Sequence, residues 1–410
     1  MVDNIEKIIT DIKLDRSAWR LVTFGDVAVQ QKQTVDRENT HLTRYIKGEH
    51  MSSEDLHIRE WGELTDEYLG PAFIRKFRKG DILYGSRRTY LRKVAIADFD
   101  GITSNTTFVI NANENKIDKR LLPFIMLSEG FTEHSIKNSK GSVNPYVNWK
   151  DLADYEFLLP PPEEQQKLAE LLWAMDEVIE REKKVLDNLK VLLESEIEEQ
   201  LHGIPLYGKN INFAINELIN RKSAVKLKSL GEFLKGKGIA KSDVIEEGIP
   251  CVRYGELYTK HHRIIRKYHS FISEEVAVAG LRLKKGDVLI AGSGETISEI
   301  GKSAAFISDD EVYAGSDTLI FRPYEMNGIY LGYLMNSQFV RQQLNKFGTG
   351  ATVMHIYTSD LKKIIVPAHN LSQQKSIAEK LELISQSIQG LKNKIDSSQA
   401  LQKSIINQIF

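Results

Sequence analysis

The residues best suited to chemistry in this sequence are basic side chains beside aromatic rings and small-residue loops. One cluster follows the turn at Gly80 and surrounds a tyrosine with four cations: Arg87, Arg88, Tyr90, Arg92 and Lys93. Arginine and lysine bind phosphate, so the cluster is a candidate contact for DNA. The alternative is a solvated strand face, which is the commoner environment of surface arginines.

Two loops of small residues each precede the last strand-like run of their half of the chain. The first loop offers Ser139, Lys140, Ser142 and Asn144, and the second, at 348–352, offers Thr349 and Thr352. Glycine lets a backbone approach phosphate closely, and hydroxyl groups can donate to it. We therefore predict a DNA contact at both loops, with a plain turn as the alternative.

A further group of cations lies in the second half of the chain. Three lysines surround two glycines, and an arginine and a tyrosine stand on the next strand-like run: Lys235, Lys237, Lys241, Arg253 and Tyr254. These residues are predicted to contact phosphate. The doublet His261-His262 has no Cys, Asp or Glu at ligand spacing beside it, so we expect a polar loop there and no metal.

Three segments resemble catalytic motifs, but each lacks a required residue. Segment 231–238 nearly spells a phosphate-binding loop, yet Gly238 replaces the hydroxyl that would hold magnesium. The Asn-Pro-Tyr at 144–146 lacks a proline of the amino-methyltransferase motif, and no glycine-rich cofactor turn precedes it. The Gly-Ser-Gly at 292–294 is followed by residues that break the nucleophile-elbow pattern. We therefore expect neither a catalytic centre nor a cofactor in this chain.

The elements that position these residues occur twice. Three signatures return in the same order, the first two shifted by 206 residues and the third by 208: 21–27 as 227–233, 79–83 as 285–289, and 165–167 as 373–375. A weaker match of 104–106 with 316–318, shifted by 212, indicates an insertion in the second copy. This period is too long for a solenoid and indicates a tandem domain duplication.

Each copy reads as a strand-rich α+β domain. Short β-prone runs at 81–84, 107–110 and 318–321 predict strands. The run 156–159 ends at three prolines, and Glu163 and Glu164 follow where a helix N-terminus favours negative charge. A long helix is predicted to begin there.

Two long helices are predicted, each with an apolar heptad seam. The first seam is interrupted only by Glu182, and the second by Ser398 and Gln402; the seam residues are Leu168, Leu172, Met175, Ile179, Leu186, Leu189 and Leu193, and Ile377, Leu381, Ile384, Ile388, Leu391, Ile395, Ile405 and Ile409. Each helix could reach about 38 residues, or roughly 57 Å.

The charges of the two helices favour their pairing. Residues 163–200 carry a net charge of −7, and the second helix carries +2. The alternative is that each helix packs only on its own domain. A second apolar stripe on the first helix, formed by Leu171, Val178, Val185 and Leu192, predicts an exposed docking surface.

Composition bounds the class of protein. A chain of 410 residues is expected to form two domains, and its single cysteine suits the cytosol and excludes an intramolecular disulfide. Neither a signal peptide nor a membrane span is indicated. The net charge of the chain is −1, but without segment 163–200 the remainder carries +6, which is compatible with DNA binding.

The duplication, the segment Pro-Pro-Glu-Glu-Gln-Gln-Lys at 161–167, and the second strand-proline-helix entry from Val366-Pro367 to 373–375 resemble the specificity subunit of type I restriction-modification enzymes. The resemblance covers essentially the whole chain. It implies a first target recognition domain at 1–160, a central long helix at 161–204, a second recognition domain at 205–368 and a C-terminal long helix at 369–410. The helices would form an antiparallel coiled coil with a pseudo-twofold repeat.

The same resemblance implies the partners. Each recognition domain would read one half of a split, asymmetric site in double-stranded DNA, while the helices set the spacer. Modification (methyltransferase) subunits, two of them, would dock and supply S-adenosylmethionine, and restriction motor-nuclease subunits would join for cleavage, all in the cytoplasm. Two alternatives remain: a helical interaction scaffold without DNA contact, and an enzyme fragment, for which the required cofactor turn or metal cluster is not found.

Overall fold

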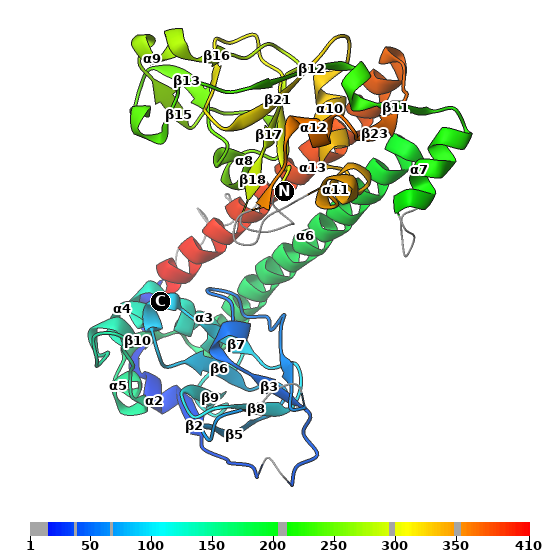
Figure 1. The fold of residues 1–410 in the computed structure, drawn as a ribbon. Coiled ribbons are helices and arrows are strands. Elements are labelled where there is room, and N and C mark those ends of the chain that lie inside the picture. The colour runs from blue at the N-terminus through cyan, green and yellow to red at the C-terminus, as the bar shows by residue number, and fades with distance from the viewer. Residues whose placement is uncertain (1–14, 37–38, 66–68, 204–210, 295–299, 348–353) are drawn as a thin grey trace. The chain divides into compact units, whose positions relative to one another are not determined.

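The computed structural model describes residues 15–36, 39–65, 69–203, 211–294, 300–347 and 354–410 (Figure 1). The chain divides into two compact units, one of Met1–Lys184 with Asn393–Phe410 and the other of Val185–Lys392. Two long helices, α6 (Pro162–His202) and α13 (Leu371–Ile409), contribute a part to each unit. Among the described residues, no helix is long and apolar enough to cross a membrane.

Two four-stranded sheets form the strand-rich domain of the first unit, in the orders β2-β9-β6-β7 and β4-β3-β8-β5. Neighbouring strands are antiparallel except β3 and β8, and a separate pair, β1 and β10, lies beside the start of α6. The strands are β1 (Arg20–Thr23), β2 (Ala28–Gln31), β3 (Arg44–Ile46), β4 (Gly62–Glu63), β5 (Phe73–Phe77), β6 (Ile82–Gly85), β7 (Val94–Ile96), β8 (Gly101–Ser104), β9 (Thr107–Ala112) and β10 (Glu156–Leu159).

Strand β6 shows why these short apolar runs form a buried sheet. Side chains on a strand alternate between faces. Leu83 packs in the cluster that contains Phe77 of the second sheet, whereas Ile82 and Tyr84 pack with the helices. Those helices are α2 (Phe24–Val27), α3 (Leu122–Leu127), α4 (Glu129–Lys137) and α5 (Trp149–Ala153). Both faces of the sheet are therefore covered, which an uninterrupted apolar strand requires.

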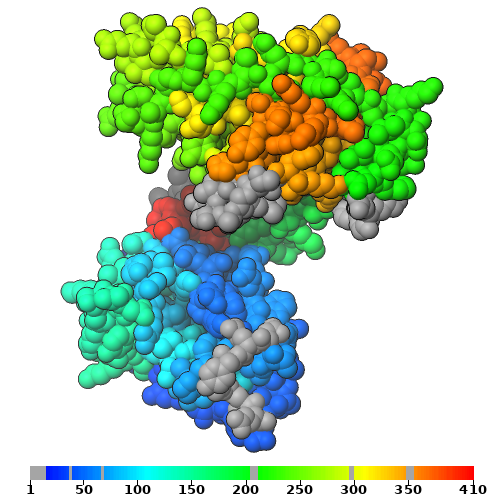
Figure 2. Space-filling view, in the orientation of Figure 1, coloured from blue at the N-terminus to red at the C-terminus, as the bar shows by residue number. Residues whose placement is uncertain are grey.

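The second unit repeats this topology with one added strand, β14, which is parallel to β19, in the sheet orders β12-β21-β17-β19-β14 and β15-β13-β20-β16. Its strands are β11 (Ala224–Lys226), β12 (Gly231–Lys235), β13 (Ile249–Val252), β14 (Arg263–Ile265), β15 (Ser270–Ile272), β16 (Leu281–Arg282), β17 (Val288–Ala291), β18 (Ser293–Gly294), β19 (Ser303–Phe306), β20 (Tyr313–Ala314), β21 (Thr318–Pro323), β22 (Met354–His355) and β23 (Ile365–Pro367). Its helices are α7 (Ile211–Asn220), α8 (Glu256–Thr259), α9 (Glu274–Ala279), α10 (Gly328–Asn336), α11 (Gln338–Asn345) and α12 (Thr358–Leu361). The space-filling view shows the first domain in blue to cyan and the second in green to orange (Figure 2).

The Lys-Gly-Asp turn has the same structural role in both domains. Gly80 and Gly286 adopt φ of 92° and 96°, which favours glycine. The following carboxylate closes the turn, because Asp81 accepts from the backbone N–H of Arg78 at 2.7 Å and Asp287 accepts from that of Lys284 at 2.8 Å. The turn shared by the two copies therefore stabilises the frame.

The structure corrects two of the repeat shifts by one residue. Strands β9 and β21 begin at Thr107 and Thr318, a shift of 211, where the weak sequence match indicates 212. At the long helices the shift is 209 and not 208. Gln165 accepts from the N–H of Asp118 and donates to the carbonyl of Pro160, while Gln374 does the same with Asn327 and His369. Each copy contains two adjacent glutamines, and burial of one of them decides which pair is equivalent.

The long helices pair in antiparallel orientation. In the first unit, Gln402 of α13 donates to the carbonyl of Leu172 of α6, and Lys394 pairs with Glu182 at 2.7 Å. In the second unit, Lys380 pairs with Glu196 at 2.7 Å. The predicted seam is buried at Leu168, Leu172, Met175, Ile179 and Leu193 of α6. The predicted α+β tandem fold with paired helices is confirmed, and each helix also packs on the domains.

Candidate nucleic-acid interface

Two groups of residues predicted separately lie side by side in the first domain. Arg87 forms an antiparallel β-bridge with Tyr146, and the N–H of Arg88 donates to the carbonyl of Pro145 at 2.7 Å. The side chains of Thr89 and Ser139 are also hydrogen-bonded, at 3.2 Å. The resulting basic loop surface consists of Arg87, Arg88, Tyr90, Lys140 and Ser142, all exposed.

The backbone around Tyr90 has an uncommon geometry. A short 3₁₀ helix, η3 (Thr89–Leu91), is flanked by Arg88 and Arg92, each at φ of 50°. Non-glycine residues rarely adopt positive φ, and such strain persists only where the surroundings hold it. Here the bridge to the 140–146 loop and the ion pairs of Arg92 hold the segment. The conformation leaves Tyr90 53% exposed.

Arg92 and Lys93 are engaged with other parts of the domain. The Arg92 side chain is only 10% exposed and forms ion pairs with Glu54 at 2.8 Å and Glu129 at 2.6 Å. Lys93 donates to the backbone carbonyl of Gly48. Since their charges already have partners, we leave both residues out of the basic loop surface. Lys140 also has a partner, Asp151 at 3.2 Å, but its side chain is 59% exposed.

In the second domain, three predicted residues line one pocket of about 590 Å³: Lys241, Arg253 and Tyr254. Lys235 pairs with Asp317 at 2.9 Å, and Lys237 is exposed. Ser139 and Asn144 of the first domain are partly buried. Thr349 and Thr352 lie outside the described residues. As DNA contacts, all of these residues remain predictions.

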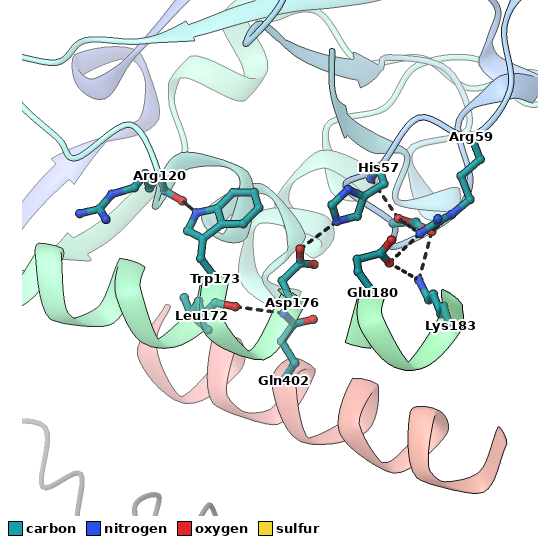
Figure 3. A network of polar contacts seen from close by, with 10 residues as sticks. His57, Arg59, Arg120, Leu172, Trp173, Asp176, Glu180, Lys183 and Gln402 are labelled. Carbon is teal, nitrogen blue, oxygen red and sulfur yellow. Dashed lines mark hydrogen bonds and ion pairs between the residues drawn. The ribbon is translucent and has the colours of Figure 1, made fainter. Parts of the chain in front are cut away.

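The structure shows an anchor between the first domain and α6 that sequence reasoning missed. The side chains of His57 and Asp176 lie 2.8 Å apart, and Arg59 pairs with Glu180 at 2.7 Å (Figure 3). Lys183 of α6 contacts Asp55 at 3.3 Å. The hydrogen bond to Asp176 raises the pKa of His57 above its usual value. The only sequence signal was the polar spacing of the helix face.

This anchor contains the one histidine and carboxylate group of the described residues with the spacing of a metal site. It is formed by Asp55, His57 and Glu180, whose ligand atoms lie within 4.8 Å of one another. Arg59 and Lys183 already neutralise the two carboxylates, so the group serves as an ion-pair network. Near the doublet at 261–262, the structure places Glu256 3.3 Å from His261, a contact that the sequence spacing does not indicate. The neighbouring residue His262 is exposed.

The fold defines a tandem-domain protein in which two related α+β domains are attached to a pair of antiparallel helices. The family model described as "Type I restriction modification DNA specificity domain" matches residues 17–191 and again 221–397. The chain therefore belongs to the family of type I restriction-modification specificity subunits, which are non-catalytic components of these enzymes.

Individual relatives agree with this assignment. The chain is 26% identical to the MjaVIII specificity subunit of Methanocaldococcus jannaschii, over 96% of this chain and 92% of that protein. It is 30% identical to the EcoDI specificity subunit of Escherichia coli, over 40% of this chain and 37% of that protein. The solved S subunit from M. genitalium has a similar fold, with a TM-score of 0.56 at 14% identity, covering 97% of this chain and 98% of that one. A chain from a structural study of type I complex assembly has a TM-score of 0.58 at 20% identity, covering 96% of both.

Proposed function

We propose that each recognition domain reads one half of a split, asymmetric site in double-stranded DNA and that the paired helices set the spacer. The observation that carries this proposal is the repetition of one two-sheet topology with different loops, each copy anchored on the same antiparallel helices. Half-sites on one face of DNA lie about 34 to 36 Å apart. A helix of 41 residues is longer than this distance, so the paired helices are long enough to set it.

The basic loop surface is the proposed contact of the first domain. Arg87 and Arg88 are exposed, and no ion pair of either is found in the described part of the chain. The β-bridge at Arg87 and the positive φ of Arg88 fix the backbone of the segment, so its backbone costs little entropy to order on DNA. Arginine there can contact phosphate, which contributes affinity, or a base edge, which contributes specificity.

The proposed partners follow from the family. Two modification subunits would dock on this chain and bind S-adenosylmethionine, and restriction motor-nuclease subunits would join for cleavage in the cytoplasm. On α6, Val178, Val185 and Leu192 are 37%, 50% and 45% exposed, respectively. Exposed valine and leucine at heptad spacing suit a partner helix better than water. The modification subunit is the proposed occupant.

The test is recovery of DNA from a random duplex pool by the purified chain with its modification subunit. Recovery of one split sequence with a constant spacer is the expected result. A helical scaffold without DNA contact would form the same protein complex but recover no sequence. That outcome would overturn the proposed reading of DNA without affecting the family assignment.

A further inference from the structure

The pocket of the second domain is formed by loops at one edge of the domain. It contains the residues after β13, the entry to β15, the loop after β12 and the residues before β21. Three cations line it, Lys241, Arg253 and Lys260, against two carboxylates, Glu256 and Asp317, and Lys235 pairs with Asp317 at its edge. The charge balance of the pocket is therefore positive.

Neither carboxylate is free to repel an anion. Asp317 is paired with Lys235 at 2.9 Å. Glu256 has a side chain only 6% exposed, and its carboxylate accepts from Ser270 Oγ at 2.5 Å and from Arg253 Nε at 3.2 Å. His261 Nε2 lies 3.3 Å from its other oxygen. Burial favours a raised pKa for Glu256, but these hydrogen bonds bring it below its usual value, so the carboxylate stays ionised.

Glu256 determines how Arg253 is presented. The hydrogen bonds found for the Arg253 side chain in the described residues, to Glu256 and to Ser270 Oγ at 3.1 Å, both use Nε. The two terminal nitrogens therefore remain as donors, on a side chain that is 31% exposed. A guanidinium anchored in this way presents two parallel N–H groups, the geometry that matches two oxygens of a phosphate.

Hydroxyl groups complete the donor set. Ser316 Oγ accepts from the N–H of Ile239 at 3.1 Å, so its own hydrogen remains available to a ligand. Tyr254 also lines the pocket, whereas the hydroxyl of Thr259 already donates to the carbonyl of Gly255 at 3.2 Å. In the first domain the equivalent residue after β3 is Lys47, since Tyr45 in β3 and Cys251 in β13 occupy the same place in their parallel pairs. Both domains thus have a cation directly after this strand.

We propose that this pocket binds a backbone phosphate of DNA beside the second half-site, with Arg253 as the contact and Glu256 as its positioning residue. The proposal rests on the reading of DNA proposed above and adds a named anion site to it. A phosphate protrudes from the duplex and can enter a concave pocket, whereas a base edge lies at the floor of a groove and is reached by protruding elements. The contact would fix the register of the second domain and carry no sequence information.

The experiment is equilibrium DNA binding by the full-length chain with its modification subunit over a series of salt concentrations. Two duplexes are compared, one with the recovered split site and one scrambled. For Arg253→Gln we expect about tenfold weaker binding to both duplexes. The slope of log affinity against log salt concentration should fall by about 0.9, the value for one phosphate contact. Lys228→Gln, an equal charge change at an exposed site outside the pocket, should leave the slope nearly unchanged.

The positioning role has its own variants. Glu256→Ala should reduce the slope as much as Arg253→Gln, while Glu256→Gln, which keeps an acceptor oxygen for Arg253 Nε, should restore most of it. Melting temperatures show whether the domain is folded. An unchanged slope in folded Arg253→Gln would overturn the pocket assignment, and so would a loss of affinity confined to the split-site duplex with an unchanged slope. Failure of the unmodified chain to select any duplex would instead overturn the proposed function.

Discussion

Lys394 of α13 lies 2.7 Å from Glu182 of α6, and Glu182 is the charged residue that interrupts the apolar seam of its helix. The carboxylate is buried, with a side-chain exposure of 9%, while the lysine is half exposed. A buried charge is tolerated only with a partner, so this pair favours one register of the two helices over slipped alternatives. With the shift of 209, the position equivalent to Glu182 in α13 is Leu391, where the seam is apolar.

Removing Lys394 should cost more stability than replacing Glu182 by leucine. We expect Lys394→Ala to destabilise the chain by about 1 to 2 kcal/mol, a value reduced from the cost at a fully buried pair because the lysine is half exposed. Glu182→Leu, which copies the equivalent position, should be neutral or stabilising. Thermal denaturation of both variants checks this. Equal destabilisation by the two substitutions would contradict it.

Shortening both long helices by one heptad should change the spacer of the target site and neither half-site. Each seven-residue deletion preserves the seam and brings the ends about 10 Å closer along the helix axis. Methylome sequencing of a host that expresses the shortened chain reads out the site. Altered half-sites with an unchanged spacer would show that the helices do not set the spacer length.

Exchange of residues 20–160 for the same domain of a relative should change one half-site alone. Each domain contains its own pair of sheets and its own loops, so the reading surface should move with it. The methylated sequence of the hybrid is the measurement. A simultaneous change of both half-sites would mean that the domains read DNA as one surface.

Arg87 and Arg92 should respond differently to substitution although both belong to the predicted cluster. The double variant Arg87→Ala, Arg88→Ala should weaken DNA binding and lower its salt slope by about one unit for each phosphate interaction that it removes, or cost about 1 to 3 kcal/mol at one position if a base is read. Arg92→Ala should instead lower the melting temperature, because it removes the ion-pair partner of Glu129 and leaves Glu54 paired with Lys403 alone. Unchanged affinity and slope in the double variant would indicate that these arginines lie on an ordinary solvated face and do not contact DNA.

The anchor at His57 should make the stability of the first unit depend on pH. The folded pKa of His57 is raised, so its contribution is complete below the unfolded value of about 6.5 and is lost as pH rises through the folded pKa. Stability should therefore fall between about pH 6 and pH 8 more in the unmodified chain than in His57→Asn. Denaturant titrations across this range provide the measurement. Parallel pH profiles would contradict an ionic contact with Asp176.

Much of the fold could be predicted from local patterns. The heptad seams, the proline-terminated strands and the repeated turns depend on periodicity and on residues that are neighbours in the chain, so the sequence alone was sufficient for two α+β domains and two long paired helices. The same repeated segments carried the family resemblance. The charge asymmetry of the helices predicted their pairing, and Lys380 with Glu196 now provides one of its contacts.

Tertiary structure alone decided which residues meet. The short match of 165–167 with 373–375 gave a shift of 208, and the burial of Gln165 and Gln374 corrected it to 209. Arg87 and Arg92 are the same residue type, yet Arg87 is exposed and Arg92 lies between Glu54 and Glu129. Both glutamates come from segments more than thirty residues away along the chain. The anchor of His57 on Asp176 depends on a contact across 119 residues. Sequence periodicity specifies which face of an element is buried, but the identity of the partner across a long loop depends on packing of the whole domain.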